Sequence, residues 1–74
     1  MFGLGKPRSR FGKWLDRNGI TQEELSRESG VNKSTISRIC SGDAFKPSIR
    51  SAAKIIKALR NRGKDVTMDD FWSM

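Results

Sequence analysis

The chain has 74 residues, enough for a single small domain with a small hydrophobic core. Its 15 Lys and Arg against 8 Asp and Glu give a net charge of +7, which favours a polyanionic partner, nucleic acid before an anionic membrane surface. One cysteine, Cys40, and no histidine exclude an internal disulfide and argue against a metal site or a cofactor. No apolar run approaches the roughly 20 residues of a membrane span, and the first residues lack a signal-peptide pattern, so we expect a cytoplasmic protein.

The first twenty residues predict a basic arm and then a helix. Residues 1–8 contain glycine and proline and are expected to form a flexible basic N-terminal arm, with the folded domain over residues 9–74. Ser9 is expected to cap a helix that ends near Asn18, where Gly19 supplies a left-handed residue. The apolar face of this helix is formed by Phe11, Trp14 and Leu15, and we expect Trp14 to belong to the core.

Two further helices are predicted with a tight turn between them. Thr21 and Glu24 form a capping box that starts a helix from Gln22 to about Ser29. Gly30 permits a turn with positive φ. Asn32 is a good N-cap for the next helix, which is expected to run from residue 33 to residue 40.

The rest of the chain predicts a loop, a longer helix and a short final helix. Residues 42–47 are expected to form a loop, and Ser48 opens a helix over residues 49–61 that Gly63 closes. Thr67 and Asp70 predict a second capping box on a short helix. The apolar stripe of the longer helix is expected to comprise Ile49, Ala52, Ala53, Ile55, Ile56 and Leu59, while Phe71 and Trp72 cover the core.

The helix over residues 33–40 has two chemically different sides. On a helical wheel its polar residues, with Ser41, fall within about 140° of each other, and Ile36 and Ile39 lie opposite. The polar side has no acid: it carries Lys33, Ser34, Ser37, Arg38 and Ser41. Lys and Arg donate to guanine O6 and N7, and serine can contact a base or a phosphate. An acidic preceding helix, with a net charge of −2 over residues 21–30, suits a helix that faces away from DNA.

The spacing of small and apolar residues from Gln22 onward fits a helix-turn-helix. In a twenty-residue frame that starts at Gln22, position 5 must be small, position 9 favours glycine, and positions 4, 10, 15 and 18 must be apolar. This chain places there, in order of position, Leu25, Ser26, Gly30, Val31, Ile36 and Ile39.

The residues of this frame resemble the Cro/phage-repressor (lambda-repressor-like, XRE) helix-turn-helix family. The similarity rests on the run from Thr21 to Ser26 and the run from Gly30 to Ile39, and it extends over about residues 9–72. It implies an all-α, compact five-helix domain that binds double-stranded DNA in transcription control, usually as a homodimer on a near-palindromic operator. Ser26, where alanine is commoner, and Ser29, where an apolar residue is usual, are expected to loosen the packing of the second helix.

The resemblance also implies roles for individual residues. Gln22 matches the glutamine that holds a phosphate and braces the DNA-contacting helix, and Lys33, Ser34 and Arg38 match positions that contact bases. Ser37 lies beside them. Ser41, Lys46 and Arg50 match the region that contacts the DNA backbone. The basic arm adds three cations that could follow the duplex, namely Lys6, Arg8 and Arg10.

Several alternatives remain open at this stage. An antitoxin or adaptor could use the same fold to bind a protein partner through the acidic second helix or the apolar tail over residues 71–74. A nucleic-acid binder without sequence preference is a third reading. Thr35 could contact a phosphate or pack against the second helix, and Cys40 is expected to be a small buried side chain rather than a redox switch. The chain is not expected to be an enzyme, because it has neither histidine nor a phosphate-binding loop.

Overall fold

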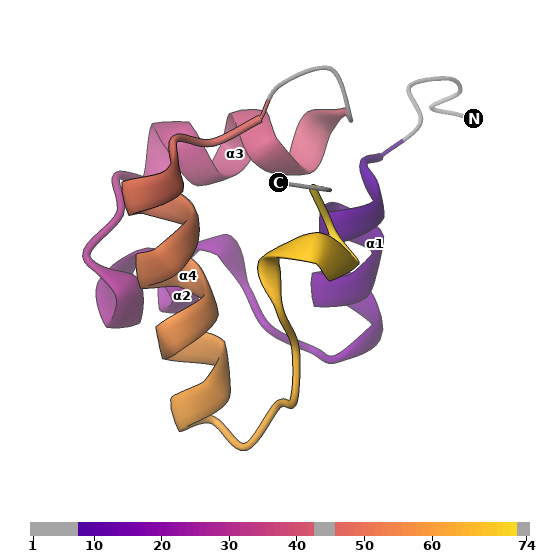
Figure 1. Cartoon of the computed structure of the whole chain (residues 1–74). Helices are drawn as coiled ribbons and strands as arrows, with labels where there is room; N and C mark the ends of the chain where they lie inside the picture. Colours follow the sequence, from indigo (N-terminus) through magenta and orange to yellow (C-terminus); the bar gives the residue numbers. More distant parts are fainter. Residues whose placement is uncertain (1–7, 43–45, 73–74) are drawn as a thin grey trace.

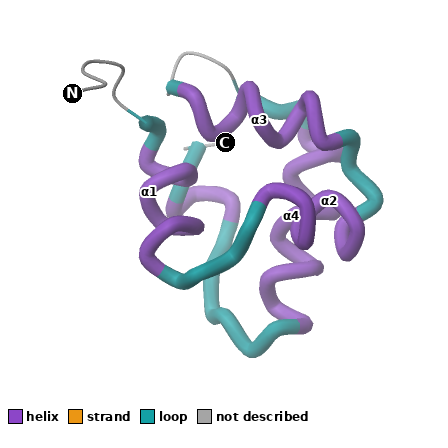
Figure 2. The backbone as a smooth tube through the Cα atoms, turned by 180° about the vertical axis from the view of Figure 1, so that it is seen from behind, coloured by secondary structure: helices purple, strands orange, loops and turns teal. Residues whose placement is uncertain are grey.

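The computed structural model describes residues 8–42 and 46–72 of the chain. These residues form four α-helices and one 3-10 turn, without a strand among them: α1 (Arg10–Arg17), α2 (Gln22–Ser29), α3 (Lys33–Ser41), α4 (Ile49–Asn61) and η1 (Met68–Asp70). Helix α3 lies across one end of the molecule, while α1 and α4 extend away from it with the C-terminal segment between them (Figure 1). Seen from behind, α2 lies beside α4 (Figure 2). The prediction of an all-α domain is confirmed.

The helix starts follow from hydrogen bonds between neighbouring residues. The Ser9 hydroxyl accepts from the backbone N–H of Gly12 at 2.9 Å and caps α1. The predicted capping box of α2 is present, since the Thr21 hydroxyl accepts from the Glu24 N–H at 3.0 Å and the Glu24 carboxylate accepts from the Thr21 N–H at 3.1 Å. Gly19, with φ of 67°, has the expected left-handed conformation after α1. The predicted bounds of α1 and α2 are therefore confirmed.

Two elements near the later part of the chain differ from expectation. Helix α3 continues one residue further than predicted and includes Ser41. The last predicted helix is a single 3-10 turn, in which the Asp70 carboxylate accepts from the Thr67 N–H at 2.8 Å. Met68–Asp70 has too few residues for an α-helix to form and continue. The capping residues therefore close a single turn, and no longer helix follows. The five-element domain thus consists of four α-helices and η1.

The buried face of α4 is displaced from the predicted stripe. Its buried residues are Ala52, Ile55, Ile56, Ala58 and Leu59, whereas Ile49 is 69% exposed and Ala53 is also exposed. On a wheel at 100° per residue, Ile49 and Ala53 lie at the edge of the buried arc, on the same flank as Arg60. The period of the stripe was correct, but its centre was wrong because alanine at residue 58 also packs inward.

Aromatic side chains fasten the C-terminal segment to α1. The Phe11 ring lies 5.0 Å from that of Phe71, edge to face, and 5.2 Å from that of Trp72. Trp14, which is partly buried, contacts Phe71 at 5.5 Å. Phe71 and Trp72 therefore cover the core, as predicted. Among the described residues, no helix has the length and apolar character that a membrane span needs.

Candidate nucleic-acid interface

The crossing of α2 and α3 is formed by aliphatic side chains from both helices. Leu25 of α2 and Ile36 and Ile39 of α3 are completely buried, and Val31 between the helices is 6% exposed. These four residues occupy the four apolar positions of the helix-turn-helix frame. Their burial fixes one side of α3 against the domain, so the opposite side must face outward.

The turn between α2 and α3 is pinned by two serines that contact Val31. Gly30 adopts φ of 76°, a left-handed conformation that glycine reaches without strain. The Ser26 hydroxyl donates to the Val31 carbonyl at 2.7 Å, and the Val31 N–H donates to the Ser29 hydroxyl at 3.1 Å. Both serines, at which looser packing was expected, therefore form hydrogen bonds to Val31, and the looser packing itself stays a prediction. Both hydroxyls satisfy backbone groups that a turn leaves unpaired.

The first turn of α3 is capped, and its outward side is polar. The Asn32 side-chain oxygen accepts from the Ser34 N–H at 2.9 Å, which confirms Asn32 as the N-cap. The five predicted contact residues are all exposed, and they come from successive turns of the same helix: Lys33, Ser34, Ser37, Arg38 and Ser41. Thr35 is half-buried at the edge of this face. The structure thus gathers the five side chains on the outward side of α3, with no carboxylate between them.

The last turn of α3 is held by α1. The Ser9 N–H donates to the Cys40 carbonyl at 3.0 Å. Helix α1 approaches so closely that a Cβ added at Gly12 would lie 2.6 Å from this same oxygen. The sequence interpretation did not foresee the contact of Ser9 and Gly12 with the end of α3. A glycine in the middle of an otherwise regular helix was the available signal, because such a glycine usually marks a close approach of another backbone.

Gln22 lies where it can brace α3. It is half-buried at the start of α2, near enough to the Cys40 thiol to influence the pKa of that group. Burial raises the pKa of this thiol, against the smaller opposing effects of the nearby Arg8 guanidinium and of the Gln22 side chain. Cys40 is completely buried, as expected, and its raised pKa keeps the thiol protonated and unreactive.

Two cations follow α3 in the chain near the same end of the molecule. Lys46 and Arg50 are exposed, on either side of the Ser48 cap of α4. The Ser41 hydroxyl donates to the Ser37 carbonyl at 2.8 Å, so its oxygen can still accept a hydrogen bond. The intervening residues 43–45, including the predicted loop residue Phe45, lie outside the described part of the chain.

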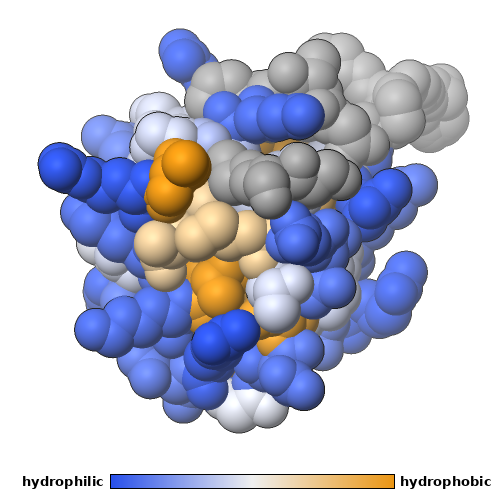
Figure 3. Space-filling model, viewed as in Figure 1, coloured by the Kyte–Doolittle hydropathy of each residue, from blue (hydrophilic) through white to orange (hydrophobic). Residues whose placement is uncertain are grey.

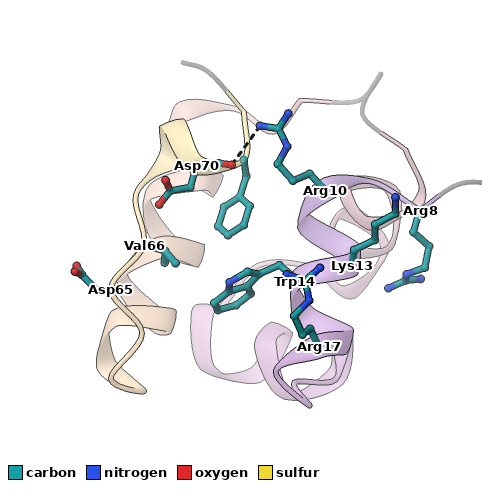
Figure 4. Close-up of a pocket in the computed structure, with 9 residues that line it drawn as sticks. Arg8, Arg10, Lys13, Trp14, Arg17, Asp65, Val66 and Asp70 are labelled. Atoms are coloured by element: carbon teal, nitrogen blue, oxygen red, sulfur yellow. Dashed lines mark hydrogen bonds between the residues drawn. The ribbon is translucent and has the colours of Figure 1, made fainter.

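The predicted DNA arm is only partly described, and its visible cations contact the domain. Lys6 lies outside the described residues. Arg8 is paired with Asp16, with an Nε–Oδ2 distance of 2.8 Å. Arg10 extends over a hollow between α1 and the C-terminal segment and donates to the Asp70 carbonyl at 3.5 Å (Figure 4). Arg8 and Arg10 therefore both interact with the folded domain in this structure.

Two of the three acids of α2, Glu24 and Glu28, pair with one cation. Arg62, which follows α4, donates to both carboxylate oxygens of Glu28 at 2.8 and 2.9 Å and lies 3.5 Å from Glu24. In contrast, Lys33 and Arg38 have no ion pair within the described residues. Lys33 and Arg38 thus carry positive charge without an ion pair on the outward side of α3. Nor do the described residues contain a group of three or more His, Cys, Asp or Glu side chains that could hold a metal ion.

Comparisons with known proteins agree with this geometry. The profile of the helix-turn-helix family matches residues 12–63, which includes α2, the turn and α3. An uncharacterized HTH-type transcriptional regulator from Archaeoglobus fulgidus is 35% identical over 63 residues, covering 85% of this chain and 89% of that protein. No solved structure matches the chain significantly. The chain therefore belongs to the Cro/C1-type helix-turn-helix family, whose regulators bind DNA.

Proposed function

We propose that this protein is a sequence-specific transcriptional regulator, acting as a repressor in the cytoplasm, that places α3 in the major groove of double-stranded DNA. One observation carries the proposal: α3 has a completely buried aliphatic side and an exposed side that is cationic and hydroxylic. A helix of this kind fits the major groove, where Lys and Arg can contact base edges. Repression would follow from occupation of a promoter, with two copies of the chain on a near-palindromic operator.

The hydrogen bonds of α3 support a preference for guanine. Adenine is recognised by an amide side chain that donates and accepts at once, but the Asn32 oxygen is already used by the helix cap. Lys33 and Arg38 offer only donors, which match the two acceptors of guanine. Arg38 follows Lys33 by five positions, or about 7.5 Å along the helix axis. We therefore expect two guanines about two base-pair steps apart in each half-site, since steps along a strand are about 3.4 Å.

Contacts to the DNA backbone are assigned to the neighbours of α3. Gln22 at the start of α2 and Lys46 after α3 flank the helix in the chain, and Arg50 lies in the first turn of α4. Such contacts fix the register of the helix in the groove without selecting a sequence. Arg8, which is paired with Asp16, would contact DNA only if that ion pair opened.

A protein partner remains the alternative function. Part of its support is lost, because Phe71 and Trp72 are buried against α1 and are not available to a partner. Ser73 and Met74 lie outside the described residues. Two of the three acids of α2 are also engaged, since Glu24 and Glu28 contact Arg62. The exposed apolar side chain of Ile49 is the observation that still favours a protein contact.

Selection of bound duplexes from a random pool tests the proposal. The expected result is one consensus with guanine at two positions of each half-site, the half-sites lying about one helical turn apart, and binding that weakens steeply with salt. Recovery of duplexes without a consensus would indicate a general nucleic-acid binder. Failure to retain any duplex at low salt would contradict the proposal and leave the protein-partner alternative.

A further inference from the structure

A hollow between α1 and the C-terminal segment has the size of a site for a small molecule. Its volume is about 530 Å³ (Figure 4), within the range of roughly 300–1,000 Å³ that small-molecule sites usually have. On the face that Figure 3 shows, exposed apolar side chains gather over α4, whereas the α1 side is hydrophilic. We call this space the α1 hollow. None of the described residues that line it belongs to α3, so it is separate from the candidate DNA-contacting face.

The apolar surface of the α1 hollow includes a tryptophan ring that the core covers only in part. Trp14 is partly buried and packs edge to face on Phe71, with the ring centroids 5.5 Å apart. Phe71 itself is 7% exposed, so Trp14 is the residue that offers open ring surface. Figure 4 shows the Trp14 side chain between α1 and the C-terminal segment, and both aromatic residues line the hollow. A ring exposed in this way can stack with a planar base.

Three cations share the side of α1 that carries Trp14. On a helical wheel this side spans about 100°, and its cations, which also line the α1 hollow, are Arg10, Lys13 and Arg17. Lys13 and Arg17 are exposed, four positions apart, and neither has an ion pair within the described part of the chain. Like charges at this spacing on a helix repel each other, and an anion bound between them would offset that repulsion. A phosphate group, which accepts several hydrogen bonds from Lys and Arg, therefore fits beside the Trp14 ring.

Carboxylates line the opposite side of the α1 hollow. Figure 4 shows Asp65 and Asp70 on the C-terminal segment, across from the side chains of α1. The Asp70 carboxylate accepts from the Thr67 N–H at 2.8 Å, and Asp65 is exposed without an ion pair among the described residues. Carboxylates accept hydrogen bonds from hydroxyl groups, including those of ribose, but repel a second anionic group. A ligand that fits the hollow must therefore combine an anionic end with an uncharged part that donates hydrogen bonds.

We infer that the α1 hollow binds a nucleoside monophosphate. The base would stack on Trp14, the phosphate would lie at Lys13 and Arg17, and the ribose hydroxyls would donate to Asp65. Inorganic phosphate offers no ring to Trp14. An aromatic carboxylate offers a ring and an anionic group, but no hydroxyl donors to Asp65. Of these three ligand classes, only a nucleoside monophosphate matches the ring, the cations and the carboxylate together.

Calorimetric titration of the full chain with each of the four common ribonucleoside monophosphates tests this inference. At least one should bind at millimolar concentration or below and quench tryptophan fluorescence, while inorganic phosphate and indole-3-acetate should bind about tenfold more weakly or not at all. Lys13→Gln combined with Arg17→Gln should weaken nucleotide binding by about tenfold or more, and both side chains are exposed, so the fold should be retained. Lys54→Gln combined with Lys57→Gln, an equal loss of charge on α4 outside the α1 hollow, is the matched control.

The ribose contact has a separate test. The wild-type protein should bind the ribonucleoside monophosphate more tightly than its 2′,3′-dideoxy analogue by about threefold or more, because the analogue lacks the hydroxyl donors. Asp65→Ala should remove this difference. If Asp65→Ala keeps the full wild-type preference, the ribose does not contact Asp65 and the assigned arrangement is overturned.

The outcomes separate this inference from the proposed function. Binding of no nucleotide, or binding that the combined Lys13→Gln and Arg17→Gln changes leave unaltered, would overturn the inference, while DNA binding by α3 would stand. Loss of nucleotide binding on combining Lys33→Gln with Arg38→Gln would place the nucleotide on α3 and overturn the inference as well. If the expected pattern holds but the wild-type protein retains no duplex, the α1 hollow is a nucleotide site and the proposed function fails.

Discussion

The two ends of α3 are held in different ways. At its start, Asn32 caps the helix and two serines bond to Val31, all within seven residues of the chain. At its end, the Cys40 carbonyl accepts from the N–H of Ser9, which lies 31 residues earlier. The first end is built from local hydrogen bonds, whereas the second depends on how closely α1 packs. The orientation of the candidate DNA-contacting face therefore depends on local hydrogen bonds at one end of α3 and on packing against a distant segment at the other.

The largest expected effect comes from the long-range end. Gly12→Ala would place a methyl group 2.6 Å from the Cys40 carbonyl, so α1 and α3 must move apart. Overpacking of this kind costs about 1–3 kcal/mol of unfolding free energy. We expect a lower thermal midpoint. We also expect DNA binding to weaken by more than the loss of stability alone explains. Gly42→Ala is the matched control, because Gly42 has extended backbone and open space at its Cβ position. An unchanged thermal midpoint for Gly12→Ala would show that the close packing of α1 does not hold the end of α3.

The cap at the start of α3 should give the next largest effect. Asn32→Ala removes the acceptor for the Ser34 N–H and should destabilise the domain by about 1 kcal/mol, measured by chemical denaturation. Asn32→Ser keeps a capping oxygen and should recover most of that loss. Equal losses for both variants would mean that the cap is not what stabilises this end.

Ser26 should contribute somewhat less than the cap. Ser26→Ala removes the 2.7 Å hydrogen bond to the Val31 carbonyl and is expected to cost about 0.5–1 kcal/mol, partly offset because alanine favours helix. Ser37→Ala removes the same hydroxyl from an exposed position of α3 and serves as the control for unfolding free energy. A gain in stability for Ser26→Ala would show that the hydroxyl does not hold the turn.

The smallest expected effect concerns the capping box of α2 and depends on pH. The hydrogen bond from the Thr21 N–H, aided by Arg62, lowers the pKa of Glu24 from its ordinary value of 4.5. Its contribution to stability is therefore full above pH 4.5 and is lost as the pH falls through the lowered pKa. Glu24→Gln keeps a capping oxygen but not the charge, so its thermal midpoint should approach that of the wild type below pH 4.5. Glu23→Gln, which removes the same charge one residue earlier, is the control, and a midpoint difference for Glu24→Gln that stays constant with pH would contradict the assignment.

The same contrast explains what the sequence could predict. The capping residues of α1, α2 and α3 and the left-handed Gly30 act on close neighbours, so their spacing alone located the helices and the outward face of α3. The contact of Gly12 with the Cys40 carbonyl joins distant segments and has no periodic signal. The exposure of Ile49 and Ala53 was not foreseen. The period of apolar residues in α4 identifies an apolar face, but not how far the rest of the domain covers that face. The hydrogen bonds of Ser26 and Ser29 to Val31 were not foreseen, because hydrogen bonds to backbone groups depend on turn geometry.

The most direct test of α3 as the DNA-contacting helix is the sequence preference of Arg38→Ala, with Lys46→Ala as its comparison. Both side chains are exposed cations, but only Arg38 lies on the outward side of α3. Binding is measured to the duplex that the wild-type protein selects and to duplexes that differ from it at one base pair. Arg38→Ala should lose about 1–3 kcal/mol of discrimination between bases at a single position. Lys46→Ala should weaken binding to all sequences alike and reduce the salt slope by about 1. If Arg38→Ala keeps the wild-type preference at every position, α3 does not contact the bases as proposed.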